Sequence, residues 1–560
     1  MAYRTGFERF RRHGEAFFIV SPSLPILMVA NAEVLSHIAT HREKFPKWTT
    51  PYAILRQFGG ENVITSEGQV WRMHRKVTSA SFNERNAAVI FREAIVQTQG
   101  MLRTWMGPTG VRKETLHTVD GDTMRLALNI IGYVGFGLRL LWPGQTLPAG
   151  SDPRLVKYAS LEAPAGHKMS FADTMAGLME NIMLLLLAPK WLLRALPSKR
   201  TRLAADAYED YVKYMDEMME EKMEEARKGD GADEGMDLMG HLVQTTYKAG
   251  QGGSGDNGRS RTVLNREEII SNAFIMFVAG HETTANVLHF AMVQLATNPA
   301  AQRRLQRDLD ELVGTSDPAS WDYGTLLNPL MASMAGACMY ETMRILPPVT
   351  EMPKTVTVDQ PVDMDGRRYV VPKDTVVSMV AVSAHHNPRY WPHAESRATR
   401  GQDDLRDFKP ERWFQTSASG AGGATDMAGA DAGDYGGYEG PDTSPQLFRP
   451  ERGAYIPFSD GARSCLGRRI AQVEMVAALA VVFREHSLEL AVDEWASEEE
   501  TAAMGRDGLR EVYGRAQQKS LWTMRQARNL LTLKLHGGVH VPLRVVRRGG
   551  ERFVGWMEDS

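Results

Sequence analysis

The feature that most constrains this chain is a ten-residue string near its carboxyl end, FSDGARSCLG at residues 458–467. It places Cys465 between Gly461 and Gly467, directly before a stretch with a helical pattern. Glycine lets the backbone turn tightly and lets another group approach it closely. A thiolate in such a loop faces backbone N–H groups, and the positive end of the following helix points toward it. The string therefore predicts a loop that holds a thiolate, with Phe458 shielding the sulfur.

The chain has only two cysteines among its 560 residues, Cys338 and Cys465. Two thiols cannot form a disulfide framework, and so low a number fits a reducing compartment. Cys338 lies in a helical pattern beside Tyr340 and has no glycine turn, so we interpret it as a buried core residue. An isolated cysteine would receive the same interpretation, and only the complete string argues for a functional Cys465.

Charge and hydropathy exclude some classes of protein. The formal net charge is -3, which is not the basic excess that nucleic-acid binding requires. No stretch reaches the roughly 20 apolar residues of a membrane-spanning helix. The strongest, residues 182–196, is interrupted by Pro189, Lys190 and Arg194. The amino-terminal residues lack the order of a secretory signal. We therefore expect a chain that is soluble or lies on a membrane surface.

Hydrophobic periodicity predicts a mainly α chain with small β-sheets. Most of residues 32–246 has a helical pattern. A long helix is expected at 267–295, and a second helix follows it. Further helices are expected at 331–346 and 471–484. The expected extended regions are two runs within residues 15–31, a small sheet at 355–380 and an extended stretch at 530–546. Residues 416–445 are rich in Gly, Ala, Ser and Asp and poor in apolar residues, which predicts a flexible insertion. We expect one large domain over residues 1–560.

A second motif is the string AGHETT at residues 279–284, within the long apolar helix. Gly280 and a threonine weaken the regular helical ladder there and open a groove. Glu282 beside Thr283 can relay protons through water. The alternative is a helix kink with a capping role. We interpret His281 as a packed or hydrogen-bonded residue rather than a metal ligand.

Three weaker motifs accompany these two. Trp71 and Arg75 share one helical face, although this spacing is common on protein surfaces. Glu341 and Arg344 are also neighbours on a helix, and such a pair is usually an exposed one of little energetic value. His385, His386 and His393 fit no standard zinc spacing, so we interpret them as parts of a structural loop.

Together these strings resemble the cytochrome P-450 superfamily, in particular its fungal members, over almost the entire chain. FSDGARSCLG matches the haem-binding signature at every defining position, AGHETT resembles the oxygen-activation motif, and Trp71 and Arg75 resemble the W-x-x-x-R helix. The resemblance implies the cytochrome P-450 fold and haem b, with Cys465 as the iron ligand and Thr283 and Glu282 as catalytic residues. The implied haem contacts are Trp71, Arg75, Ala279, Phe458, Gly461, Arg463, Cys465 and Gly467, in which the two arginines pair with propionates.

The same resemblance implies that Glu341 and Arg344 form a buried structural pair, completed by an arginine from a P-E-R segment. Two such segments are present, one with Arg412 and one with Arg452. We assign Arg412, because an aromatic pair follows it, and the duplication leaves Arg452 open.

The implied activity is that of a haem-thiolate monooxygenase, which inserts one oxygen atom of O2 into an apolar organic substrate. Electrons would come from NADPH through a separate flavoprotein reductase, because the chain has no convincing nucleotide-binding loop. Secondary metabolism is the expected setting. The alternatives are a haem-thiolate isomerase or dehydratase and a non-enzymatic haem protein. Candidate substrate-lining residues are Ile275, Ala279, Thr283, Val349 and Thr350.

The chain departs from the family pattern in three places. It has no amino-terminal anchor of the microsomal type, it contains the insertion, and Lys354 stands where many members have a propionate-binding arginine. The location stays open between the endoplasmic reticulum membrane surface, with peripheral contact, and the cytoplasm. We expect a basic reductase-docking patch from Arg72, Lys76, Arg468 and Arg469.

Overall fold

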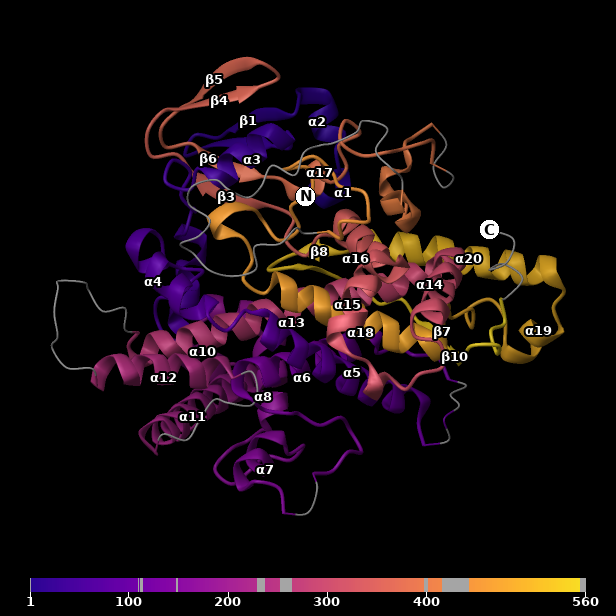
Figure 1. Ribbon diagram of the computed structural model, residues 1–560, viewed down its shortest axis with the longest axis horizontal. Helices are drawn as coiled ribbons and strands as arrows, with labels where there is room; N and C mark the ends of the chain where they lie inside the picture. Colours follow the sequence, from indigo (N-terminus) through magenta and orange to yellow (C-terminus); the bar gives the residue numbers. More distant parts are fainter. Residues whose placement is uncertain are drawn as a thin grey trace.

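The computed structural model describes residues 2–108, 110, 114–147, 150–228, 237–251, 264–396, 401–414 and 443–553. Helices make up most of these residues, and a four-stranded sheet lies to one side of them (Figure 1). The expected mainly α architecture with small sheets is therefore confirmed. The expected insertion at 416–445 lies outside the described residues, apart from its last three.

The α-helices are α1 Ala2–Thr5, α2 Glu8–His13, α3 Ala32–Thr40, α4 Gly68–Ser79, α5 Glu84–Met106, α6 Val119–Phe136, α7 Pro153–Ala159, α8 Phe171–Glu180, α9 Ile182–Leu187, α10 Lys190–Ala195, α11 Lys199–Lys228, α12 Leu238–Gln251, α13 Arg266–Thr297, α14 Pro299–Leu312, α15 Tyr323–Ala332, α16 Met334–Ile345, α17 Ala381–Ala384, α18 Arg468–Glu485, α19 Glu498–Ala503 and α20 Arg506–Met524. The 3-10 segments are η1 Thr50–Phe58, η2 Pro318–Ser320, η3 Asp404–Arg406, η4 Pro410–Phe414 and η6 Gly461–Arg463. The strands are β1 Ala16–Val20, β2 Pro25–Val29, β3 Met352–Thr355, β4 Gln360–Met364, β5 Arg367–Val371, β6 Val376–Met379, β7 His486–Leu490, β8 Arg528–Asn529, β9 Leu533–Lys534 and β10 Leu543–Arg547.

Helix α13 has 32 residues and runs through the middle of the molecule, where it packs against α6, α16 and α18 (Figure 1). Its start is fixed by a capping box, in which the side chains of Asn265 and Glu268 each accept a hydrogen bond from the other's backbone. At Gly280 a β-carbon would lie 2.6 Å from Cδ1 of Ile131 in α6. Glycine therefore permits the close approach of these two helices.

The largest described sheet has the strand order β1-β2-β6-β3. Strands β1 and β2 are antiparallel and confirm the two runs expected within residues 15–31. Strand β2 pairs in parallel with β6 (Ile26↔Val376), and β3 pairs antiparallel with β6 on its other side. An isolated bridge between Lys47 and Lys354 extends the pairing beyond β3. The sheet thus brings the amino-terminal part of the chain to Lys354.

Two regions differ from the sequence expectation. Helices α19 and α20 precede the carboxyl-terminal strands and were not expected, and the predicted extended stretch at 530–546 contains only β9 and β10, which pair with different partners. The apolar stretch at 182–196 forms two six-residue helices, α9 and α10, with Pro189 between them. None of the helices in the described ranges combines the length and the apolar composition that a membrane crossing requires.

Candidate active site

The cysteine loop is closed by its own backbone before α18 begins. The N–H of Cys465 donates to the carbonyl of Phe458 at 2.9 Å, and that of Ser464 donates to Gly461 at 2.9 Å. Gly461 has a φ of 68°, and a β-carbon there would lie 2.2 Å from the carbonyl oxygen of Ala39 in α3. Only glycine fits this position, because of both the left-handed backbone and the contact. The loop leaves the side chain of Cys465 exposed.

The surroundings of Cys465 favour a thiolate. Helix α18 begins at Arg468, so its positive end lies three residues after the sulfur-bearing residue. Arg75 on α4 donates to the carbonyl of Ser464 at 2.7 Å. Burial lowers the pKa of Arg75 to about 10, and the charge of Cys465 acts against this lowering. A β-carbon at Gly467 would lie 3.9 Å from the ring of Phe82, an aromatic neighbour of the loop that the sequence analysis did not identify.

Trp71 and Arg75 place α4 against this loop. Trp71 is 1% exposed, and its ring lies between two guanidinium groups. Those of Arg42 and Arg463 are 4.6 and 4.2 Å from the ring centroid. The side chain of Arg463 also contacts Glu67 and donates to the carbonyl of Ser66 at 2.8 Å.

A cluster of buried cations surrounds Glu67. Burial, followed by the nearby charges of Arg463 and Lys354, lowers the pKa of Lys47 to about 7. Burial and Arg463 likewise lower the pKa of Lys354 to about 8. Burial raises the pKa of Glu67, but Arg463, two backbone N–H groups and Arg42 outweigh it, so that this pKa is lowered overall. The four cations Arg42, Lys47, Lys354 and Arg463 therefore outnumber the carboxylates of Glu67 and of Glu43, which pairs with Arg42, as in a site for an anionic group.

This donor set fits haem. The two carboxylates of a haem would supply the negative charge that the cluster of Arg42, Lys47, Lys354 and Arg463 around Glu67 requires. The Nε of Arg463 is buried and has no hydrogen-bond partner among the described residues. Lys47 was not identified in the sequence, because an isolated lysine carries no pattern.

Glu341, Arg344 and Arg412 form one buried cluster behind the cysteine loop. Arg344 donates twice to the carboxylate of Glu341, each time at 2.8 Å, and Arg412 approaches the same carboxylate at 3.4 Å. Trp413 donates to Glu341 at 3.0 Å. Arg452 lies elsewhere, paired with Asp460 at 2.9 Å in a more exposed position. Arg412 therefore contacts Glu341, and Arg452 does not.

His385 connects this cluster to the cysteine loop. Its carbonyl accepts a hydrogen bond from Arg344 at 3.0 Å, and its Nε2 accepts one from the N–H of Ile456 at 2.9 Å. Ile456 is two residues before Phe458. Burial lowers the pKa of His385 to about 3, so the ring is neutral and free to accept. The imidazole has a structural role in this loop.

The AGHETT segment contains accessible residues just before the fully buried carboxyl-terminal part of α13. Ala279 is exposed and Thr283 is partly exposed, whereas residues 284–297 are all buried. Thr283 donates to the carbonyl of Ala279 at 2.6 Å. Glu282 is 7% exposed and forms an ion pair with Lys534. His281 is buried, its Nε2 lies 3.0 Å from the carbonyl of Met124, and burial lowers its pKa to about 4, in agreement with the packed role expected for it.

The predicted substrate-lining residues divide into two groups. Ala279, Thr283 and Val349 have accessible surface, whereas Ile275 and Thr350 are buried. Thr350 accepts a hydrogen bond from the amide of Asn529 in β8 at 2.6 Å.

The predicted basic patch is smaller than expected. Arg468 is 5% exposed, whereas Lys76 is exposed. Arg469 pairs with Glu84 at 2.9 Å, and Arg72 pairs with Glu43 at 2.7 Å, so acidic neighbours balance both.

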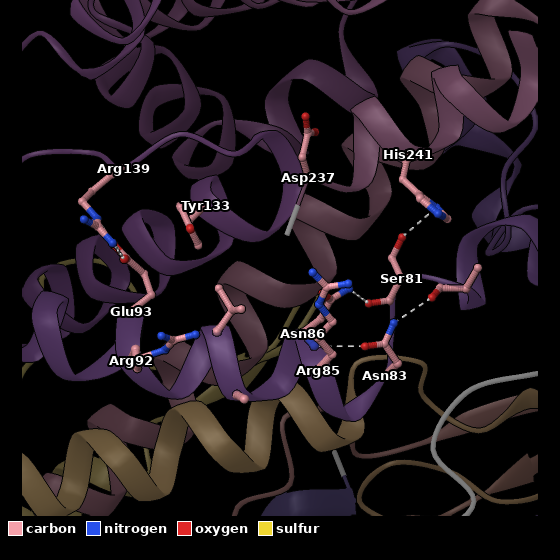
Figure 2. Close-up of a pocket in the computed structure, with 13 residues that line it drawn as sticks. Ser81, Asn83, Arg85, Asn86, Arg92, Glu93, Tyr133, Arg139, Asp237 and His241 are labelled. Carbon is pink, nitrogen blue, oxygen red and sulfur yellow. Dashed lines mark hydrogen bonds and ion pairs between the residues drawn. The ribbon is translucent and has the colours of Figure 1, made fainter. Parts of the chain in front are cut away.

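A separate cavity of about 800 Å³ lies between α5, α6 and α12 (Figure 2). Its lining is polar. Arg139 pairs with Glu93 at 2.6 Å, and Ser81 lies 3.4 Å from His241. None of the residues predicted for the site lines this cavity, and its charged walls do not suit an apolar substrate.

Comparisons with known proteins agree with this geometry. The family model described as Cytochrome P450 matches residues 3–508. A cytochrome P450 monooxygenase of Arthrobotrys oligospora is 28% identical over 492 residues, which are 86% of this chain and 77% of the relative. Cytochrome P450 monooxygenase 124 of Postia placenta is 30% identical over 470 residues, 83% and 75% of the two chains. A Penicillium rubens cytochrome P450 monooxygenase is 29% identical over 488 residues, 85% and 76%.

These findings confirm the family, the fold class and the haem cofactor expected from the sequence. They favour the monooxygenase over the isomerase, the dehydratase and the non-enzymatic haem protein. The family model covers most of the chain, and the relatives are fungal monooxygenases. The chain therefore belongs to the cytochrome P450 family, as a haem-thiolate monooxygenase that uses O2, an organic substrate and a redox partner.

Proposed function

We propose that this enzyme hydroxylates an apolar organic substrate of secondary metabolism with electrons from NADPH, delivered by a separate flavoprotein reductase. The observation that carries the proposal is the exposed thiol of Cys465 in a closed loop, close to buried cations that fit two carboxylates. Bound haem supplies the iron at which O2 is divided between product and water. Cys465 would ligate the iron, and Trp71, Arg75 and Arg463, together with Lys354, would hold the propionates.

In this proposal Thr283 and Glu282 supply protons to the accessible segment of α13. The Thr283 hydroxyl bonds to Ala279 one turn earlier, an interaction that weakens the local helical ladder. By rotating, the same hydroxyl can instead donate toward the accessible side and hold a water molecule. Glu282 is the neighbouring acid, almost buried but paired with a more exposed lysine. The two groups together move protons while the buried residues 284–297 of α13 exclude bulk water.

The test compares Thr283→Ala with the matched control Thr284→Ala. Thr284 is 3% exposed and lies about 100° further round the helix, so its loss leaves the accessible side intact. We expect Thr283→Ala to keep NADPH consumption but to lower the product formed per NADPH, with hydrogen peroxide making up the difference. The control should couple as the wild type does.

Product per NADPH also distinguishes the alternatives. An isomerase or a dehydratase would convert its substrate without consuming NADPH or O2, and a haem sensor would form no product.

If Thr284→Ala uncouples and Thr283→Ala does not, the proton relay is assigned to the wrong residue. If neither variant uncouples, the relay proposal fails.

For the reductase, we propose docking on the face that carries Lys76 and Arg469. Lys76 is exposed, and Arg469 forms an ion pair with Glu84. Charge reversal of Lys76 should slow the first electron transfer at low salt, because exposed charges steer association and salt screens them. Substrate affinity should stay unchanged, and an unchanged reduction rate would contradict this docking face.

We also propose peripheral contact with a membrane surface, at the endoplasmic reticulum. Leu187 in α9 and Trp191 in α10 are 72% and 71% exposed and lie four residues apart. Exposed apolar side chains of this size suit an interfacial segment. Sedimentation with phospholipid vesicles should fall for Trp191→Asp and stay unchanged for Trp522→Asp, which alters a residue of α20 that is 62% exposed.

The proposed unit is a single domain over residues 1–560. The larger of two hydrophobic cores extends from Tyr3 to Phe553 and supports this proposal, and the smaller core lies around α3, β2 and β6.

A further inference from the structure

The acid of the AGHETT segment has a cation partner from a distant part of the chain. Lys534, in β9, forms an ion pair with Glu282. The lysine side chain is 25% exposed and the glutamate side chain 7%. The pair therefore extends from the almost buried carboxylate to a partly exposed lysine side chain.

The segment that carries Lys534 is held along α13 at two points. The amide of Asn286 donates to the hydroxyl of Thr532 at 2.9 Å, and Glu282 lies one turn before Asn286. Four residues of a helix rise about 6 Å, and two residues of an extended strand rise about 6.6 Å. The distance along α13 from Glu282 to Asn286 therefore matches the distance along the strand segment from Lys534 to Thr532, so both contacts can form at once.

Two further contacts fix this segment from its other side. The N–H of Leu533 donates to the carbonyl of Pro348 at 2.9 Å, just after α16. Strand β9 also pairs with β8, with Lys534 opposite Arg528. Lys534 is thus positioned by backbone pairing rather than by its ion pair alone.

The other charged or titratable groups described around the pair are Arg528, which lies opposite Lys534 in the β8–β9 pairing, and two imidazoles. Burial lowers the pKa of His281 to about 4. Burial, and then Lys534, lower the pKa of His536, whose Nε2 lies 3.2 Å from the carbonyl of Arg528. Both rings are therefore mainly neutral at neutral pH, and the positive charge beside Glu282 comes from Lys534.

We propose that Lys534 is a positioning residue for the reaction: it holds Glu282 as a carboxylate turned toward the β8–β9 hairpin, where this carboxylate exchanges protons with solvent. This inference rests on the proposed role of Glu282 and Thr283. An almost buried carboxylate is costly without a cation, so loss of Lys534 favours a different position of the Glu282 side chain. The Glu282 carboxylate takes up a proton from water at the exposed end of the pair and passes it toward Thr283, which returns Glu282 to its carboxylate form.

The test uses Lys534→Met, which removes the charge, and Lys534→Arg, which keeps it. The control is Lys519→Met. It breaks the more exposed ion pair between Lys519 on α20 and Glu494, which precedes this helix. We expect Lys534→Met to lower kcat about tenfold, a part of the usual contribution of acid–base catalysis, and to increase the solvent deuterium isotope effect on kcat. Substrate affinity from binding spectra should stay unchanged. Lys534→Arg should restore most of kcat, and Lys519→Met should behave as the wild type.

A double-mutant cycle with Glu282→Gln separates a positioning role from a loss of stability. If Lys534 acts through Glu282, adding Lys534→Met to Glu282→Gln should change kcat less than twofold. The same tenfold loss in both backgrounds would overturn the inference, as would a wild-type isotope effect in Lys534→Met. Thr283→Ala is measured in parallel: if it uncouples while Lys534→Met behaves as the wild type, the inference about Lys534 fails and the proposed function stands. If Thr283→Ala also couples normally, the relay itself fails.

Discussion

Replacement of Arg412 by methionine should destabilise the protein far more than the same change at Arg452. Arg412 is 1% exposed, and besides Glu341 it contacts the carboxylate of Asp404 at 3.1 Å and the carbonyl of Asp404 at 2.9 Å. Loss of one partner of a buried ion pair costs about 3–5 kcal/mol. Because Arg344 still pairs with Glu341, we expect about 3 kcal/mol for Arg412→Met, the lower end of this range. Arg344→Met should reach the upper end.

The pair of Arg452 and Asp460 is 36% and 15% exposed, so Arg452→Met should cost about 0–1 kcal/mol. Urea unfolding of the haem-loaded enzyme, followed by haem absorbance and by circular dichroism, measures the difference. A gap of about 2–3 kcal/mol is roughly a 30- to 140-fold change in the folding equilibrium. Equal losses in the two variants, or a larger loss for Arg452→Met, would refute the assignment of the cluster to Arg412.

Three other changes test the remaining parts of the site. Cys465→Ser should abolish the red-shifted absorption band of the ferrous carbon-monoxide complex while Cys338→Ser retains it; the opposite result would exclude Cys465 as the ligand. Burial lowers the pKa values of Lys47 and Lys354 to about 7 and 8. The unfolded chain therefore binds more protons than the folded one above pH 7, and the haem-free protein should become more stable from pH 7 to about 10. Haem carboxylates reverse this shift, so haem release should become faster over the same window; pH-independent release would contradict the proposed propionate site. Shortening of residues 416–445 should change stability little, because loop-closure entropy varies slowly with length, and a large loss of retained haem would show that this segment is folded.

Motifs with fixed spacing made the centre of the site predictable from the sequence. The string around Cys465 describes local backbone geometry, and the turn at Gly461 is found where it was expected. The sequence does not say which group comes close to this glycine. That group is the carbonyl of Ala39, more than 400 residues earlier. Likewise, the sequence left two candidates for the partner of Glu341, and only the fold brings Arg412 to it.

Single charged residues and weakly apolar helices were not predictable. Lys47 and Lys534 have no sequence pattern. A strand bridge brings Lys47 to Lys354, and the contacts of the β9 segment with α13, with Pro348 and with β8 bring Lys534 to Glu282. Helix α20 was missed because much of its buried face is small or polar, including Ala516, Ser520 and Thr523. Burial of such residues produces little of the hydrophobic periodicity on which a helix prediction depends.

The parallel pairing of β2 with β6 also determines when this protein can fold during synthesis. Ile26 leaves the ribosome about 350 residues before Val376, its partner in the register. At 5–20 residues per second this interval is about 20–70 s. Throughout it the β1–β2 hairpin must remain unpaired along one edge, and exposed strand edges promote aggregation. The amino-terminal hairpin is therefore the segment of the nascent chain for which protection by a chaperone matters most.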